Sequence, residues 1–131
     1  MTHEVVSGLR WVMGTEHDVV IYPASGTGAW EACLVNTMSP GDRILMFETG
    51  QFSFEWSEVA RRFGLDVEYV PGDWRSGADP AVVEELLRAD RDHTFKAVAV
   101  VHNETSTGAV SRIGEIKRAI DRAGHPALLF V

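Results

Sequence analysis

The sequence has little that would suit a metal site or a disulfide framework. Cys33 is its only cysteine, which excludes an internal disulfide and any site built from several thiolates. Its five histidines are scattered, and no two have the i, i+4 spacing of a helical zinc site. We therefore expect no metal. Cys33 itself lies within an apolar pattern, and we interpret it as a buried structural thiol rather than a nucleophile.

Basic residues and long apolar runs are also scarce. Lys and Arg number 12 against 19 Asp and Glu, and the net charge is −7, which argues against a nucleic acid partner. No uninterrupted apolar run approaches the ~20 residues that a membrane-spanning helix needs. The first residues include Glu4 and no apolar core of a signal peptide. We therefore expect no membrane partner and a cytoplasmic location.

What is present is typical of one folded domain. The chain has 131 residues, of which 45% are hydrophobic and 24% charged. Apolar periodicity and turn residues predict alternating elements. The expected helices are 3–13, Thr27–Met38, Phe52–Phe63, one capped by Asp79 with Pro80 first, and one marked by Ile113, Ile116 and Ile120. The expected strands are Asp18–Tyr22, Arg43–Phe47, Leu65–Val70, Lys96–Val101 and Ala127–Val131.

This alternation predicts an α/β fold, a three-layer sandwich in which helices cover both faces of a mostly parallel sheet. Residues Lys96–Val101 are apolar on both faces, as expected of an interior parallel strand. In such sheets ligands gather at the carboxyl ends of the strands. Three loops there carry chemically useful groups: Ala24–Gly28, Glu48–Phe52 and His102–Gly108.

The glycine turn at Ser25–Gly28 allows several interpretations. The first amides of a helix can hold an anion, but the turn also suits a plain helix start capped by Ser25 or Thr27. A dinucleotide site would use Gly26, Gly28 and the later acid Glu48, yet Glu31 stands where that motif needs a small residue. The G-x-S-x-G elbow of serine hydrolases is absent.

Taken together, the three loops suit a phosphorylated, planar aromatic ligand. The turn would hold the phosphate, Phe52 would offer a flat ring, and the loop after the interior strand would supply hydroxyl and amide groups. Each has a simpler interpretation, because Phe52 also suits a helix start or a core, and Asn103–Thr107 also suits a polar turn. Their shared place at strand ends favours the ligand site.

Four motifs, in order, resemble the class V aminotransferases, closest to the serine-glyoxylate and alanine-glyoxylate branch. They are S-G-T-G-A-W-E from Ser25, S-P-G-D from Ser39, E-T-G-Q-F from Glu48 and H-N-E-T-S-T-G from His102. The resemblance implies the large domain of a type I pyridoxal phosphate transferase and a homodimer in full-length form. It also implies transfer of an amino group from serine or alanine to glyoxylate or a similar 2-oxo acid.

The resemblance assigns five cofactor-binding residues. Ser25, Gly26 and Thr27 would bind the phosphate of pyridoxal 5'-phosphate, the ring of Phe52 would stack on its pyridine, and Thr105 would face its 3-hydroxyl. Relatives use Trp at the position of Phe52, but a phenyl ring also offers a stacking face.

The resemblance assigns no catalytic residue to this chain. The family's aspartate and its Schiff-base lysine would follow Val131, and the only lysines here are Lys96 and Lys117, at other positions. We therefore expect residues 1–131 to be the central part of the large domain, without the lysine region or the small C-terminal domain. The alternatives are an inactive, truncated PLP-fold or interaction module and, less favoured because Cys33 lies in a buried pattern, cysteine desulfuration.

Overall fold

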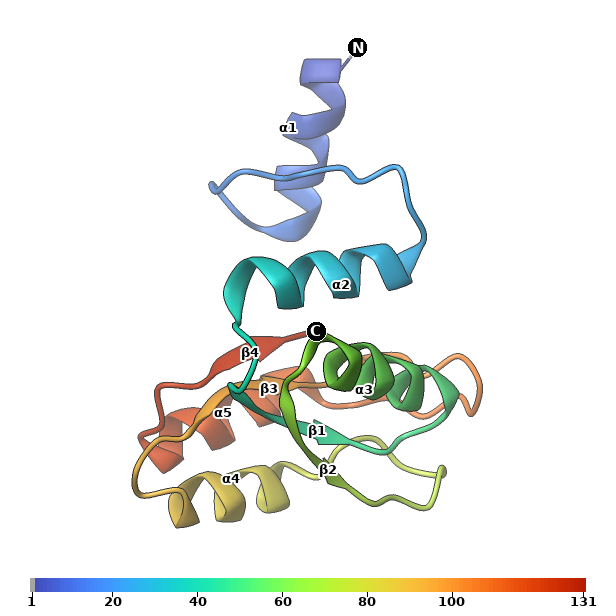
Figure 1. The fold of residues 1–131 in the computed structure, drawn as a ribbon. Coiled ribbons are helices and arrows are strands. Elements are labelled where there is room, and N and C mark those ends of the chain that lie inside the picture. Colours follow the sequence, from blue (N-terminus) through green and yellow to red (C-terminus); the bar gives the residue numbers. More distant parts are fainter. Residues whose placement is uncertain (1) are drawn as a thin grey trace.

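The computed structural model describes residues 2–131, which contain five helices and four strands (Figure 1). The elements follow in the order α1 (Thr2–Met13), α2 (Gly26–Thr37), β1 (Arg43–Phe47), α3 (Gln51–Phe63), β2 (Asp66–Val70), α4 (Pro80–Ala89), β3 (Phe95–Ala99), α5 (Ile113–Ala123) and β4 (Leu128–Phe130). The five expected helices are confirmed to within a residue or two. Asp79 caps α4 through its side chain, which accepts a hydrogen bond from the Ala81 amide at 2.8 Å.

The strands form one parallel sheet in the order β2-β1-β3-β4. Ile44 in β1 pairs with Val67 of β2 on one side and with Ala97 of β3 on the other. The two central strands are apolar along nearly their whole length because helices cover both of their faces. β2 lies at an edge and alternates exposed and half-buried residues.

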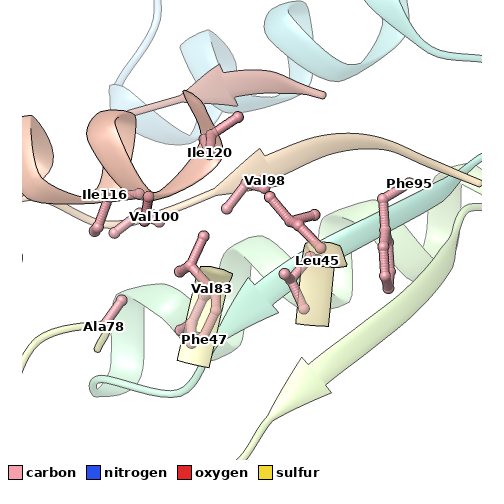
Figure 2. Close-up of a cluster of buried hydrophobic side chains, with 11 residues drawn as sticks. Leu45, Phe47, Ala78, Val83, Phe95, Val98, Val100, Ile116 and Ile120 are labelled. Atoms are coloured by element: carbon pink, nitrogen blue, oxygen red, sulfur yellow. The ribbon is translucent and has the colours of Figure 1, made fainter. Parts of the chain in front are cut away.

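Successive side chains of the central strands point to opposite layers, as the strand period of two requires. Leu45, Phe47 and Val98 pack with residues of α4 and α5, among them Val83 and Ile116, and Figure 2 shows this cluster. Ile44, Met46 and Ala97 face the other way and pack with residues of α2 and α3, among them Leu34 and Trp56. The predicted three-layer α/β sandwich is confirmed.

The expected strand at Asp18–Tyr22 is wrong. Within the described residues this segment pairs with no strand, and Val20 and Ile21 are 66% and 59% exposed. In Figure 1 the segment between α1 and α2 lies away from the sheet. An apolar run favours burial, but a strand also needs a neighbour to supply its hydrogen bonds, and neither edge of the sheet reaches this segment.

A buried carboxylate joins three elements at the amino end of the sheet. Asp90 follows α4, and its oxygens accept hydrogen bonds from the Phe95 amide at 2.8 Å and from the Thr94 hydroxyl at 2.8 Å. His125, just before β4, lies 3.2 Å away through Nε2. Burial acts to raise the pKa of Asp90, but the hydrogen bonds from Phe95, Thr94 and His125 outweigh it and lower the pKa to about 2.

We expect Asp90→Asn to lower the free energy of unfolding at pH 7 by about 2 kcal/mol. The folded pKa of Asp90 lies below its ordinary value of 3.8, so its contribution is complete above that value and is lost as pH falls toward 2. Urea unfolding from pH 7 to pH 2 should show the difference between wild type and variant shrinking by about half at pH 3. Asp92→Asn, which removes the same charge from an exposed position nearby, is the matched control.

Candidate functional site

Three segments meet in one pocket beside α2, the start of α3 and the loop that follows β3. The pocket has a volume of about 250 Å³. Its lining residues are Ser25, Gly26, Thr27, Trp30, Phe52, Val101, Asn103 and Thr105. All five residues expected from the sequence to bind the cofactor are therefore brought together at one place.

The start of α2 leaves hydrogen-bond donors available to this pocket. Ser25 is the N-cap residue, with extended backbone, but its side chain makes no capping hydrogen bond. Its carbonyl accepts from the Gly28 amide at 3.0 Å, while the amides of Gly26 and Thr27 have no partner among residues 2–131. The hydroxyls of Ser25 and Thr27 are also without partners in this described part of the chain. Such a helix start suits an anion.

Gly28 allows the turn before α2 to be this tight. A Cβ at Gly28 would lie 2.5 Å from the Cβ of Ala24. Any side chain there would therefore push Ala24 away, and the residues next to it would move with it. The glycine turn is thus a steric requirement of the pocket.

An aromatic stack braces the ring of Phe52. The Phe52 ring meets Trp30 edge to face, with 6.3 Å between ring centroids. Trp30 in turn stacks on Trp56, at 5.3 Å and an interplanar angle of 11°, and Trp56 is 1% exposed. The ring therefore has a fixed neighbour on α2 and stays 36% exposed itself.

Trp30 was not predicted from the sequence to line the pocket, because it fits the apolar pattern of its helix. Its spacing contains a usable signal. Trp30 follows Thr27 by three residues, so both occupy one face of α2. When the first turn of a helix faces a ligand, the residue three positions further along the helix faces the ligand too.

Glu104 is a second residue near the pocket whose role was not predicted from the sequence. Its side chain is 1% exposed, and its Oε1 accepts hydrogen bonds from the Phe52 amide at 3.3 Å and from the Ser106 hydroxyl at 2.7 Å. Its Oε2 accepts from the Ser53 amide at 3.0 Å. No local pattern predicts this burial, because the partners on α3 lie about fifty residues earlier in the chain.

Several candidate groups lie outside the pocket. Glu48 is the acid that a dinucleotide site would use to bind a ribose. Its carboxylate already accepts hydrogen bonds from the Gly72 amide at 3.2 Å and from Trp74 Nε1 at 2.9 Å, so a ribose would have to displace these partners. Lys96 and Lys117 do not line the pocket, and Lys117 pairs with Asp121. Cys33 is half-buried, and burial raises the pKa of its thiol.

Residues 2–131 offer neither a metal site nor a membrane-spanning helix. These residues hold no cluster of three or more His, Cys, Asp or Glu side chains that would suit a metal ion. None of their helices is long and apolar enough to cross a membrane.

Comparison with protein families matches residues 3–131 to the class-V aminotransferases. The chain is 55% identical to serine–glyoxylate aminotransferase of Methylorubrum extorquens, and the match covers 100% of this chain and 33% of that protein. It is 43% identical to L-aspartate–glyoxylate aminotransferase of Paracoccus denitrificans, with 100% and 33% covered. The chain thus spans about a third of the length of the curated relatives it matches.

Solved structures give the same fold. Aspartate aminotransferase of subgroup IV from Thermus thermophilus superimposes with a TM-score of 0.85 at 31% identity, over 96% of this chain and 34% of that one. Ureidoglycine–glyoxylate aminotransferase from Bacillus subtilis gives a TM-score of 0.82 at 29% identity, over 97% and 32%.

We expect Gly50→Ala to disturb the pocket by displacing the loop at 102–108. A Cβ at Gly50 would lie 2.5 Å from Cγ of Glu104 and 2.6 Å from Oγ of Ser106, so the loop at 102–108 would have to move. The free energy of unfolding should fall by about 2 kcal/mol. Urea unfolding measures this change, and Gly114→Ala, whose Cβ meets only an ordinary contact at 3.7 Å, is the control. An unchanged stability for Gly50→Ala would contradict the packing described here.

Proposed function

Since the chain belongs to the class-V aminotransferase family, we propose that it is the central part of the large domain of a pyridoxal 5'-phosphate-dependent aminotransferase. The enzyme moves an amino group from a small amino acid, serine or alanine, to glyoxylate or a similar 2-oxo acid. The names of the similar proteins support glyoxylate as the acceptor, and the 55% identity to a serine–glyoxylate enzyme supports serine as the donor.

One observation carries this proposal. Ser25, Gly26 and Thr27, which the family resemblance assigns to the phosphate, share a single pocket with Phe52 and Thr105, which it assigns to the ring. The three segments concerned are far apart in the sequence and meet only through the fold. A coincidence of unrelated polar turns would not place a helix start, an exposed ring and a free hydroxyl around the same space.

The donor set fits the cofactor. The amides of Gly26 and Thr27 and the hydroxyls of Ser25 and Thr27 would donate hydrogen bonds to phosphate oxygens, and the positive end of the α2 dipole adds to the attraction. The Phe52 ring offers an apolar face to a planar heterocycle. The Thr105 hydroxyl, free of partners among residues 2–131, would hydrogen-bond a ring substituent.

The residues described here bind and orient, and none of them moves the proton. Pyridoxal phosphate, when bound, supplies the electron sink that transamination requires. The lysine that this chemistry needs is neither Lys96 nor Lys117, since neither lines the pocket. We place that lysine and the small C-terminal domain in parts of the protein outside these 131 residues. The homodimer and the cytoplasmic location stay predictions.

We expect Thr27→Val in the full-length protein to weaken binding of pyridoxal phosphate about tenfold or more, because a charge-assisted hydrogen bond contributes about 1.5–3 kcal/mol. Titration of the apoprotein, followed by absorbance, measures the dissociation constant. Thr37→Val, at the other end of α2, is the matched control, since its hydroxyl donates to the Cys33 carbonyl within the helix and Thr37 does not line the pocket.

Formation of glycine from glyoxylate, with serine and with alanine as donors, tests the reaction itself. A wild-type protein that neither binds pyridoxal phosphate nor forms glycine from either donor would overturn the proposed function.

A further inference from the structure

The N-cap residue of helix α3 is Gly50, which has no side chain to accept from the amides of the first turn. Ser53 Oγ accepts from the Gly50 amide at 3.1 Å, which leaves the amides of residues 51–53 to be satisfied. The first amides of a helix lack partners within the helix and need acceptors from elsewhere. Here the acceptors come from the loop at 102–108. Ser106 Oγ accepts from the Gln51 amide at 2.9 Å, and Glu104 accepts from the amides of Phe52 at 3.3 Å and Ser53 at 3.0 Å.

Both oxygens of Glu104 are therefore occupied by α3, and the loop holds the carboxylate in place. Oε1 also accepts from the Ser106 amide at 3.2 Å and from the Ser106 hydroxyl at 2.7 Å. Thr107 adds a further link, since its hydroxyl donates to the Thr49 carbonyl at 3.1 Å. The loop and the start of α3 thus form one hydrogen-bonded unit.

Among residues 2–131, hydrogen-bond donors rather than cations face the carboxylate of Glu104. No cation pairs with it among residues 2–131, and its side chain is 1% exposed. Burial acts to raise the pKa of Glu104, but hydrogen bonds from Ser106, Ser53 and Phe52 outweigh it and lower the pKa. The amides at the positive end of α3 therefore stabilise an ionised carboxylate in the interior.

This arrangement connects two sides of the pocket. Glu104 precedes Thr105 in the chain and holds the backbone amide of Phe52, while the side chains of both these residues line the pocket. Glu104 itself is not among the lining residues, so it does not touch a ligand there. We propose that Glu104 is a positioning residue that fixes the spacing between the Phe52 ring and the Thr105 hydroxyl. Its relevance to cofactor binding rests on the proposed function.

Glu104→Gln tests this role in the full-length protein. The amide group of Gln turns one acceptor into a donor that faces the backbone N–H groups of α3, so Phe52 and Thr105 should lose their fixed spacing. The matched control is Glu84→Gln, which removes a carboxylate that pairs with Arg88 at 2.8 Å and Arg122 at 2.7 Å and joins α4 to α5 on the opposite face of the sheet.

The first measurement is hydrogen exchange of the cofactor-free protein. In Glu104→Gln the amides of residues 51–54 and of residues 104–108 should exchange about tenfold faster or more, because both segments lose the same acceptor. In Glu84→Gln both segments should match the wild type. Unchanged exchange in either segment of Glu104→Gln would overturn the proposal.

The second measurement is binding of pyridoxal phosphate, by its dissociation constant and by the visible circular dichroism of the bound cofactor. Glu104→Gln should raise the dissociation constant about tenfold and reduce the dichroic band at saturation, whereas Glu84→Gln should change neither. A Glu104→Gln protein that is less stable but retains both values would show a purely structural role and overturn the proposal.

Binding of pyridoxal phosphate by the wild type separates the proposed function from the positioning role of Glu104. If wild type and Glu84→Gln also fail to bind pyridoxal phosphate, the proposed function is wrong, and the exchange measurement alone decides the spacing role of Glu104. If Glu104→Gln does not fold, Ser106→Ala replaces it, since this change removes the hydroxyl that accepts from Gln51 and donates to Glu104. The same two measurements and outcomes then apply.

Discussion

The parallel pairing of β1 with β3 is the constraint on which the pocket depends. Residues Ile44–Met46 pair with Ala97–Ala99 in the same direction, so both strands end at the same edge of the sheet. Helix α3 begins four residues after β1, and the loop that holds Glu104 follows β3. Because the carboxyl ends of β1 and β3 are neighbours, the Glu104 carboxylate in the loop after β3 reaches the first amides of α3, the helix that follows β1.

Burial of these two strands on both faces makes that pairing secure. Their side chains alternate between a cluster with α4 and α5 and a cluster with α2 and α3, and most are less than a tenth exposed. A shift of one residue in register would exchange the two sets of side chains between layers and would displace both loops. The geometry of the site is therefore a consequence of core packing, which explains how polar loops hold a defined arrangement.

The sequence predicted the layers and three of the pocket's segments because those signals are local. Caps such as Asp79, doubly apolar runs such as Lys96–Val101 and glycine turns depend on neighbouring residues only. The mistaken strand at Asp18–Tyr22 shows the limit, since strand formation depends on a partner that periodicity does not contain. Glu104 was missed for the same reason, because its acceptor role exists only once α3 lies beside it.

Two links of different physical character join the three sides of the pocket. Between the loop and α3 the link is a buried carboxylate, which is directional and tolerates little change in distance. Between α3 and α2 the link is the stack of Trp30 on Trp56, with Phe52 at the edge of Trp30, which depends on contact area and tolerates small sliding. Phe52 thus takes part in both links, since its backbone amide donates to Glu104 and its ring meets Trp30. A substitution at Phe52 would therefore disturb the contact with α2, whereas a substitution at Glu104 would disturb the contact with the loop at 102–108.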